Sequence, residues 1–226
     1  MKQWRSATAA KKHVRGLLRQ MAPGIERCMY CDDSQGTDID HFQPIADDPL
    51  RAFDWPNHLL ACSYCNSNTK GHKYPRDETG TCLLIDPTVD DPASHLVLFL
   101  ATGVYDGITP KGAATIDVFG LNRPTLVRGR KAAFVTAKTL LGGWHEHRRA
   151  GRTDEADEIV GAIAESPFSA VVQAMLRLPR PVALVVMGAG TVLAIDEWRR
   201  CVVEAETTPG GAALSSEAST GTRPRT

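Results

Sequence analysis

Cys28-Met-Tyr-Cys31 and Cys62-Ser-Tyr-Cys65 are two C-x2-C pairs, and they carry the strongest structural signal in this chain. Two such pairs supply the four thiolates that a structural zinc ion binds in tetrahedral geometry. One pair alone would also fit a redox-active dithiol or buried thiols. Two pairs with a matching tyrosine favour zinc, so the expected ligands are Cys28, Cys31, Cys62 and Cys65.

The 30 residues between the two pairs exceed the spacing of a simple zinc ribbon. A folded insertion, most simply a β-hairpin with its loop, is therefore expected between them. Residues 38–44, with the sequence DIDHFQP, alternate in the manner of a strand. A strand that ends there in a turn would let Asp40 and His41 approach one site. A helix that begins at the second pair would place Asn66 and Lys70 on one face.

Asp40-His41, the central Asn57, and Cys62-Ser-Tyr-Cys65-Asn66 followed by Lys70 together resemble the HNH nuclease motif in its zinc-stapled ββα-metal form. The chain is similar to the HNH subfamily found in Septu-type anti-phage systems and in retron-associated nucleases. This resemblance covers about the first 130 residues and, more loosely, the remainder. Further stretches that carry it are Ile39–Pro44, Phe53-Asp54-Trp55, Cys62–Tyr74, Leu84-Ile85-Asp86-Pro87, Asp90-Asp91-Pro92, His95-Leu96 and Leu121-Asn122-Arg123.

The resemblance implies a role for each motif residue. His41 matches the general base, and an imidazole with a pKa of about 6.5 suits proton transfer at neutral pH. Asp40 and Asn66 match the ligands of a catalytic divalent metal, and such oxygen donors suit Mg²⁺ or Mn²⁺. Asn57 matches the asparagine that braces the loop and orients the histidine. Lys70 would lie near the phosphate as an electrostatic clamp.

The implied activity is an HNH endonuclease that hydrolyses phosphodiester bonds in DNA and leaves 5′-phosphate and 3′-hydroxyl ends. His41 would activate water, while the metal held by Asp40 and Asn66 would neutralise the charge that develops. Zinc would take no part in the chemistry and would replace the core that a short module cannot build. The resemblance also implies an effector of bacterial anti-phage defence that acts with a partner ATPase. The alternative is a non-catalytic zinc-stapled module that binds nucleic acid or protein.

The charge of the chain is unevenly distributed. Lys and Arg number 26 and Asp and Glu number 26, so the net charge is zero and no global field favours nucleic acid. Residues 1–27 and residues 123–149 each carry seven basic residues and one acid, whereas residues 28–70 carry seven acids and two bases. Such basic stretches are usually solvated helix faces. If a nuclease site lies between them, they would hold a DNA backbone and binding would weaken steeply with salt.

These patterns predict an α+β protein with four parts. They are an N-terminal basic helix (residues 1–27), an HNH domain with short extended segments (28–123), a helical region (124–206) and a disordered tail (207–226). The expected extended segments are Leu83–Ile85, His95–Leu100 and Thr115–Val118. The expected helices are Thr125–Ala150, Thr153–Glu165, Phe168–Leu178 and an element around Val192–Val203.

The remaining features predict a soluble cytoplasmic protein without a membrane segment. The amino terminus has no secretion signal, and the longest uncharged apolar run, Pro181–Ile195, is too short to span a bilayer. Cys82 and Cys201 have no paired partners and are interpreted as core residues. A homo-oligomer is compatible with the sequence. Residues discounted as catalytic or metal-binding are His58, His72, His145 and His147.

Overall fold

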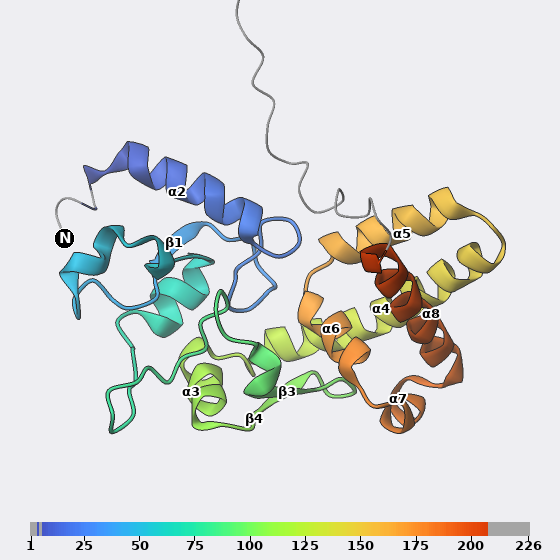
Figure 1. The fold of residues 1–226 in the computed structure, drawn as a ribbon. Coiled ribbons are helices and arrows are strands. Elements are labelled where there is room, and N and C mark those ends of the chain that lie inside the picture. The colour runs from blue at the N-terminus through green and yellow to red at the C-terminus, as the bar shows by residue number, and fades with distance from the viewer. Residues whose placement is uncertain (1–3, 5, 208–226) are drawn as a thin grey trace, which may run out of the picture.

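The computed structural model describes Trp4 and residues 6–207, with side chains as far as Cys201. It shows two small antiparallel sheets with the helices of the first 119 residues on one side, and the helices from residue 124 onward on the other (Figure 1). The protein is therefore α+β, as predicted. From position 208 onward, the expected disordered tail lies outside the described residues.

The expected basic helix is present as α2 (Thr8–Met21). Its buried residue is Leu18, and the helix packs against both strands of the first sheet. It ends before Pro23-Gly24, where Ala22 is already extended. α2 therefore carries its basic residues alongside the sheet (Figure 1).

The expected hairpin between the cysteine pairs is confirmed. β1 (Asp38–His41) runs antiparallel to β2 (His58–Ala61), with Asp38 opposite Ala61 and His41 opposite His58. The connecting loop contains two 3₁₀ helices, η1 (Pro49–Phe53) and η2 (Trp55–Asn57). All four residues of β2 are buried, so this short strand forms part of the core.

A helical turn of π type, η3 (Tyr64–Lys70), begins at the second cysteine pair and ends at Gly71, where φ is 54°. The first pair is attached to β2 by the backbone bond from Met29 N–H to the Leu60 carbonyl (2.9 Å). One cysteine pair therefore lies just before the hairpin and the other just after it.

The segment that follows forms a second hairpin and a helix. η4 (Pro92–Ser94) precedes β3 (Leu96–Phe99), which runs antiparallel to β4 (Val104–Gly107). This confirms an extended segment within His95–Leu100, whereas β4 was not predicted. Leu83–Ile85 lies outside any strand.

The expectation of an extended segment at Thr115–Val118 is wrong, because these residues lie in α3 (Pro110–Phe119). The Thr109 hydroxyl accepts a hydrogen bond from Gly112 N–H (3.1 Å), and Pro110 occupies the first turn. Gly120 ends the helix with φ at 58°. The local start and stop signals thus outweigh the β-branched residues inside the helix.

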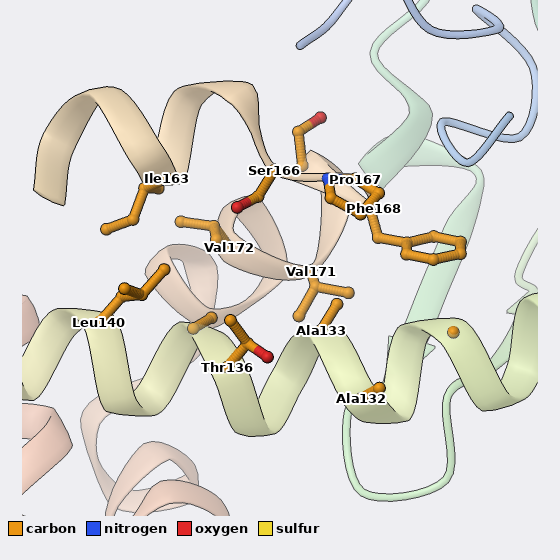
Figure 2. Close-up of a pocket in the computed structure, with 13 residues that line it drawn as sticks. Ala132, Ala133, Thr136, Leu140, Ile163, Ser166, Pro167, Phe168, Val171 and Val172 are labelled. Carbon is orange, nitrogen blue, oxygen red and sulfur yellow. The ribbon is translucent and has the colours of Figure 1, made fainter. Parts of the chain in front are cut away.

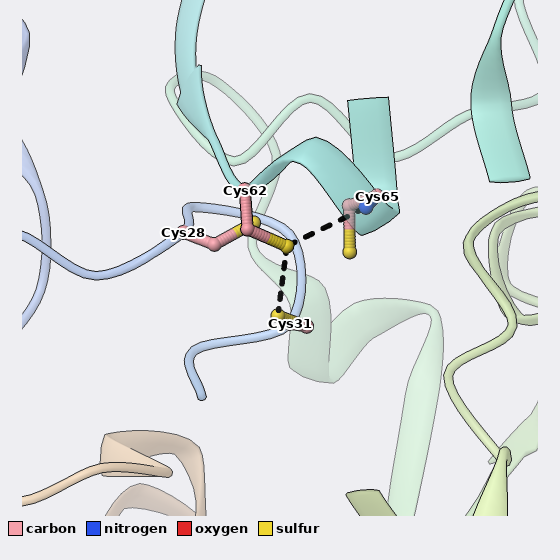
Figure 3. Close-up of side chains that lie close together, drawn as sticks. All are labelled: Cys28, Cys31, Cys62 and Cys65. Atoms are coloured by element: carbon pink, nitrogen blue, oxygen red, sulfur yellow. Dashed lines mark hydrogen bonds between the residues drawn. The ribbon is translucent and has the colours of Figure 1, made fainter. Parts of the chain in front are cut away.

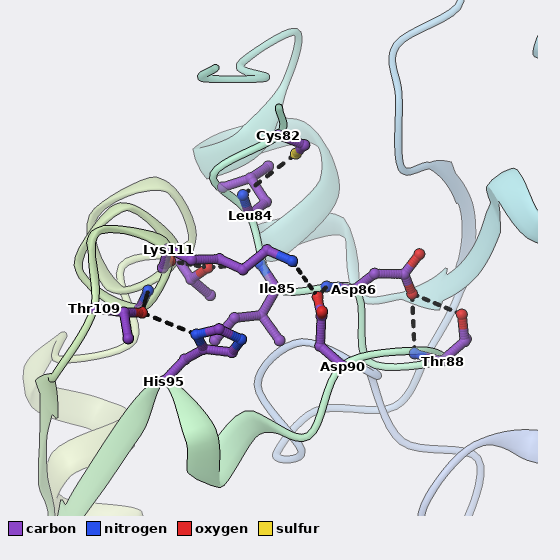
Figure 4. Close-up of polar contacts among 11 residues, drawn as sticks. Cys82, Leu84, Ile85, Asp86, Thr88, Asp90, His95, Thr109 and Lys111 are labelled. Carbon is purple, nitrogen blue, oxygen red and sulfur yellow. Dashed lines mark hydrogen bonds and ion pairs between the residues drawn. The ribbon is translucent and has the colours of Figure 1, made fainter. Parts of the chain in front are cut away.

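Polar contacts hold the loop before β3 against α3 (Figure 4). Asp90 accepts hydrogen bonds from Asp86 N–H (2.8 Å) and from the Lys111 ammonium (2.6 Å). His95 Nδ1 lies 2.9 Å from the Thr109 hydroxyl. These contacts give Asp90 and His95 a structural role in this loop.

The helical region consists of α4 (Pro124–Arg149), α5 (Thr153–Glu165), α6 (Ser169–Arg177), α7 (Arg180–Met187) and α8 (Ala189–Thr207). The four expected helices are confirmed. α7 was not predicted as a separate helix because Pro181–Ile195 is a single uncharged apolar run. Gly188, with φ at 82°, separates α7 from α8.

Two buried polar contacts attach this region to the rest of the protein. The guanidinium of Arg130 in α4 donates to the carbonyls of Gly103 and Leu121 (both 2.6 Å). Asp32, directly after the first cysteine pair, accepts a hydrogen bond from the Ser169 hydroxyl (2.7 Å) at the start of α6. Burial raises the pKa of Asp32 to about 6. The first cysteine pair is therefore fixed to α6.

An apolar cavity of about 300 Å³ lies between α4, α5 and α6 (Figure 2). Its lining is mainly aliphatic, with hydroxyls from Thr136 and Ser166. At one end the ring of Phe168 lies over Gly129, where an added Cβ would come within 2.4 Å of the ring. The absence of a side chain at this position lets α4 and Phe168 approach closely.

Gly129→Ala is expected to lower the free energy of unfolding by about 1–3 kcal/mol, because the new methyl group overlaps the Phe168 ring. Gly142→Ala in the same helix is the control, since its Cβ would have no neighbour within 4 Å. That variant should be neutral or gain up to about 1 kcal/mol of helix propensity. Urea denaturation measures both, and equal stability of the two variants would contradict the packing.

Among the described residues, no single helix has both the length and the apolarity to cross a membrane; only α5 and α6 taken together pass, as a pair bent by 110°. Cys82 and Cys201 are half-buried, so the expectation that they belong to the core is only partly met.

Candidate functional site

The four cysteines of the two pairs converge on one point (Figure 3). Their sulfur atoms all lie within 4.8 Å of one another, and the Sγ atoms of Cys31 and Cys62 are 4.0 Å apart. A tetrahedral zinc site with Zn–S bonds of about 2.3 Å needs sulfur atoms about 3.8 Å apart. All four residues are buried. The cluster could therefore hold zinc with only small side-chain adjustments.

Hydrogen bonds within the cluster shift the pKa values of the four thiols in opposite directions, lowering those of Cys31 and Cys62 and raising those of Cys28 and Cys65. A hydrogen bond from Cys28 lowers the pKa of Cys62 to about 7. The Arg123 guanidinium stacks over the Tyr64 ring at 4.3 Å from its centroid. Burial disfavours the charged form of Arg123, but the neighbouring Cys65 and Cys31 outweigh it and raise the pKa. A fixed positive charge thus lies beside a site that carries net negative charge when zinc is bound.

Asp40 lies at the centre of a buried ionic network. Its two oxygens lie 3.0 and 2.8 Å from the Lys70 ammonium, and one of them accepts a hydrogen bond from the Tyr30 hydroxyl (2.5 Å). The Lys70 ammonium also donates to the His41 carbonyl (2.6 Å). Burial raises the pKa of Asp40, and the Lys70 charge opposes this rise.

The position of Lys70 differs from the expectation. Its side chain is 0% exposed, and its three donors are directed at Asp40 and His41. A clamp on a phosphate must present its charge to solvent. In this structure Lys70 instead holds Asp40 and the end of β1 in place.

Lys70→Met is expected to cost about 3–5 kcal/mol of unfolding free energy, because it leaves the Asp40 carboxylate buried without its cation. The matched control is Arg177→Met, which breaks the exposed ion pair with Asp91 and should cost far less, since solvent screens that pair. Adding Asp40→Asn to Lys70→Met should recover part of the loss. Chemical denaturation tests this, and similar costs for the two single variants would contradict a buried pair.

His41 occupies the end of β1, where it is 9% exposed. Its Nε2 lies 3.1 Å from the Ala52 carbonyl, so Nε2 carries the hydrogen and Nδ1 keeps a lone pair. Burial lowers the pKa of His41 to about 4, and the ring is neutral at pH 7. The side chain is therefore unprotonated with a free lone pair, as a general base requires, but its lowered pKa makes it a weaker base than a free imidazole.

Asn57 is fully buried and fastens the loop between the strands. Its side-chain oxygen accepts from Gln43 N–H (2.7 Å), and its amide nitrogen donates to the carbonyls of Gln43 (3.1 Å) and Arg51 (3.2 Å). Arg51 directly precedes Ala52, whose carbonyl contacts His41. The Asn57 side chain thus acts on the histidine through the loop.

Asn66 lies in the first half of η3, and its amide nitrogen donates to Asp38 (3.3 Å). Its amide oxygen consequently faces away from Asp38. Asp40, His41 and Asn66 all line one cavity of about 250 Å³, together with Trp4. The structure therefore brings the predicted base and the two predicted metal ligands around a common space.

Trp4 and Tyr30 were not assigned to this site from the sequence, and His58 was discounted only as a catalytic residue. The indole of Trp4 lies 4.7 Å from the His41 ring and stacks on the His58 ring at 4.9 Å. His58 is buried, and its Nε2 lies 3.2 Å from the same Ala52 carbonyl. Tyr30 binds Asp40. Of these residues, only Tyr30 is marked by a sequence pattern, because a tyrosine stands at the third position of both cysteine pairs.

Comparisons with known proteins identify relatives over part of the chain. A Septu protein PtuB of Bacillus thuringiensis is 28% identical over 141 residues, which are 58% of this chain and 51% of the relative. A Septu protein PtuB of Bacillus mycoides (strain KBAB4) is 30% identical over 148 residues, 52% of this chain and 49% of the relative. The chain thus spans about half the length of the curated relatives it matches. The resemblance to Septu-type proteins is confirmed.

No protein-family model matches the chain. No solved structure matches it either.

Proposed function

We propose that this protein is a metal-dependent HNH endonuclease that hydrolyses phosphodiester bonds in DNA. The observation that carries the proposal is the cavity lined by Asp40, His41 and Asn66 beside the four-cysteine cluster. The order of elements supports it, since two antiparallel strands and a helical turn follow one another as in a ββα-metal core. The similarity to Septu proteins adds a second, independent support.

In the proposed reaction, Nδ1 of His41 takes a proton from the attacking water. The Ala52 carbonyl holds the ring through Nε2, so the lone pair stays on the atom that reacts. Asn57 keeps that carbonyl in place by fastening the loop. The water oxygen forms a bond to phosphorus and the bond between phosphorus and the 3′ oxygen breaks; the 3′ oxygen leaves and takes up a proton, which gives 5′-phosphate and 3′-hydroxyl ends.

The donor atoms fit a hard divalent cation such as Mg²⁺ or Mn²⁺. A carboxylate has about four acceptor positions, and Lys70 and Tyr30 occupy three of those on Asp40, which leaves one on Oδ1. The amide oxygen of Asn66 is the second candidate ligand. A bound cation would supply positive charge to the phosphate and to the departing 3′ oxygen.

The proposed structural cofactor is zinc, held by the four cysteines. With so few residues in its hairpin, the module needs this cross-link in place of a larger core.

The proposed biological role is an effector in bacterial anti-phage defence that acts with a partner ATPase. The similarity to Septu proteins supports this role.

The proposed DNA-binding surface is α2. Lys11, Lys12, Arg15 and Arg19 line a shared groove on this helix, which packs against β1 and β2. The second basic stretch contributes less, because Arg130 is buried and Arg123 stacks on Tyr64. DNA binding through α2 should weaken steeply with salt.

The experiment that tests the proposal is cleavage of supercoiled plasmid by the zinc-loaded protein together with its ATPase partner, in Mg²⁺, in Mn²⁺ and after removal of divalent ions by EDTA. We expect cleavage with either metal, none with EDTA, and products that DNA ligase can rejoin. Equal cleavage in EDTA would contradict the proposed chemistry.

One observation favours the alternative of a non-catalytic zinc-stapled module. Lys70 and Tyr30 already occupy most of the hydrogen-bond acceptor positions of the Asp40 carboxylate. The same assay separates the two functions. A non-catalytic module would leave the plasmid intact in every metal, although it would still bind DNA or the partner.

A further inference from the structure

The loop between β1 and β2 carries a cluster of exposed apolar side chains. Leu50 is 91% exposed, Phe53 53% and Trp55 40%. In a 3₁₀ helix, residues three apart lie on the same face, so Leu50 and Phe53 of η1 project together. Single exposed apolar residues are ordinary, but three within six positions form a patch. We call Leu50, Phe53 and Trp55 the η1 face.

The inner side of the same helix contacts the candidate catalytic site. Ala52 is buried, and its carbonyl lies 3.1 Å from Nε2 of His41 and 3.2 Å from Nε2 of His58. The Phe53 ring also contacts Trp4, which packs on both histidines. A molecule that presses on the η1 face therefore acts on the carbonyl that orients His41.

The charge around the η1 face argues for a protein partner and against nucleic acid. Residues 45–57 contain three acids and one base, Arg51, which is ion-paired with Asp54 at 2.9 Å. This negative rim repels phosphate groups. It complements a protein surface with an apolar pocket bordered by lysine or arginine.

We propose that the η1 face is the docking surface for a partner protein of this chemistry, and that its binding holds the Ala52 carbonyl and so orients His41. The inference rests on the proposed function, in which an ATPase subunit acts with this chain. Leu50 is the expected anchor, since it is almost fully exposed and lies directly beside the loop segment that holds the histidine.

The test measures the affinity of the purified ATPase subunit for the full-length, zinc-loaded chain by calorimetry. Leu50→Asp should weaken binding at least tenfold, since it places a charge in the apolar contact and adds to the acidic rim. The matched control is Val185→Asp in α7, an equally apolar side chain that is 86% exposed and lies in the helical region. Zinc content and unfolding midpoint should be unchanged in both variants.

A second readout tests the link to the histidine. Adding the ATPase subunit to the wild type should shift the imidazole NMR signals of His41 and His58, and Leu50→Asp should abolish that shift at the same concentration. Binding without such a shift would overturn the coupling.

Three other outcomes would overturn the docking surface. These are wild-type affinity of Leu50→Asp, loss of affinity in Val185→Asp instead, and no binding of the wild type. Weaker DNA binding by Leu50→Asp with unchanged affinity for the subunit would make the η1 face a nucleic-acid surface. None of these outcomes affects the proposed nuclease function, which is judged separately from metal-dependent cleavage and its loss in His41→Ala.

Discussion

His41→Ala is expected to reduce DNA cleavage by about 10²–10⁴-fold, the usual contribution of a general base. The reduction should appear in kcat, because the histidine acts on the attacking water and DNA is held elsewhere. The His41 imidazole is neutral, buried and fixed through Nε2, whereas His72, the other imidazole that lines the cavity, is exposed. Single-turnover cleavage in Mg²⁺ measures the effect.

The control for this prediction is His147→Ala. This imidazole lies at the end of α4, where it accepts a hydrogen bond from Arg152. The variant should cleave at the wild-type rate. If His41→Ala and His147→Ala cleave equally, His41 is not the base.

Cys62→Ser is expected to lose zinc and to unfold the module around the hairpin. Structural zinc contributes about 10–16 kcal/mol of apparent binding energy in small domains, comparable to the total stability of many proteins. Cys62 is central to the cluster, since its sulfur lies 4.0 Å from that of Cys31 and accepts a hydrogen bond from Cys65 N–H (3.4 Å). Metal analysis and circular dichroism measure the two losses.

Cys201→Ser is the matched control, because this half-buried cysteine lies in α8, outside the cluster. It should keep one zinc per chain and lose no more than about 0.5 kcal/mol of stability. A folded Cys62→Ser protein with a full zinc content would show that the four cysteines do not form the site.

The features predicted best from the sequence are those with local causes. The cysteine pairs repeat at short spacing, and the helices of the second half carry their own periodicity and proline boundaries. The hairpin followed from the length of chain that had to fit between the pairs. In each case neighbouring residues were sufficient, because the structural reason lies within one element.

The failures have two physical causes. At Thr115–Val118 the β-branched residues suggested a strand, but the Thr109 cap and Gly120 decide in favour of a helix. At Lys70 the resemblance implied a clamp near the phosphate, whereas the side chain is buried as the cation that pairs with Asp40. Burial of this kind depends on residues 30 positions apart and leaves no local pattern.

The contacts of His58 and Trp4 likewise depend on residues that are far apart in the sequence. His58 reaches the Ala52 carbonyl only because β2 pairs with β1 in the register that places it opposite His41. Trp4 reaches both rings from a segment ahead of α2. Sequence spacing predicts neither contact, since both arise from how separate elements pack.

The most direct test of the central claim, that Asp40, His41 and Asn66 form one metal-dependent site, is Mn²⁺ binding to the zinc-loaded protein measured by electron paramagnetic resonance. We predict one bound Mn²⁺ per chain in the wild type and in His41→Ala, and at least tenfold weaker binding in Asn66→Ala. Wild-type Mn²⁺ affinity in Asn66→Ala would contradict the account.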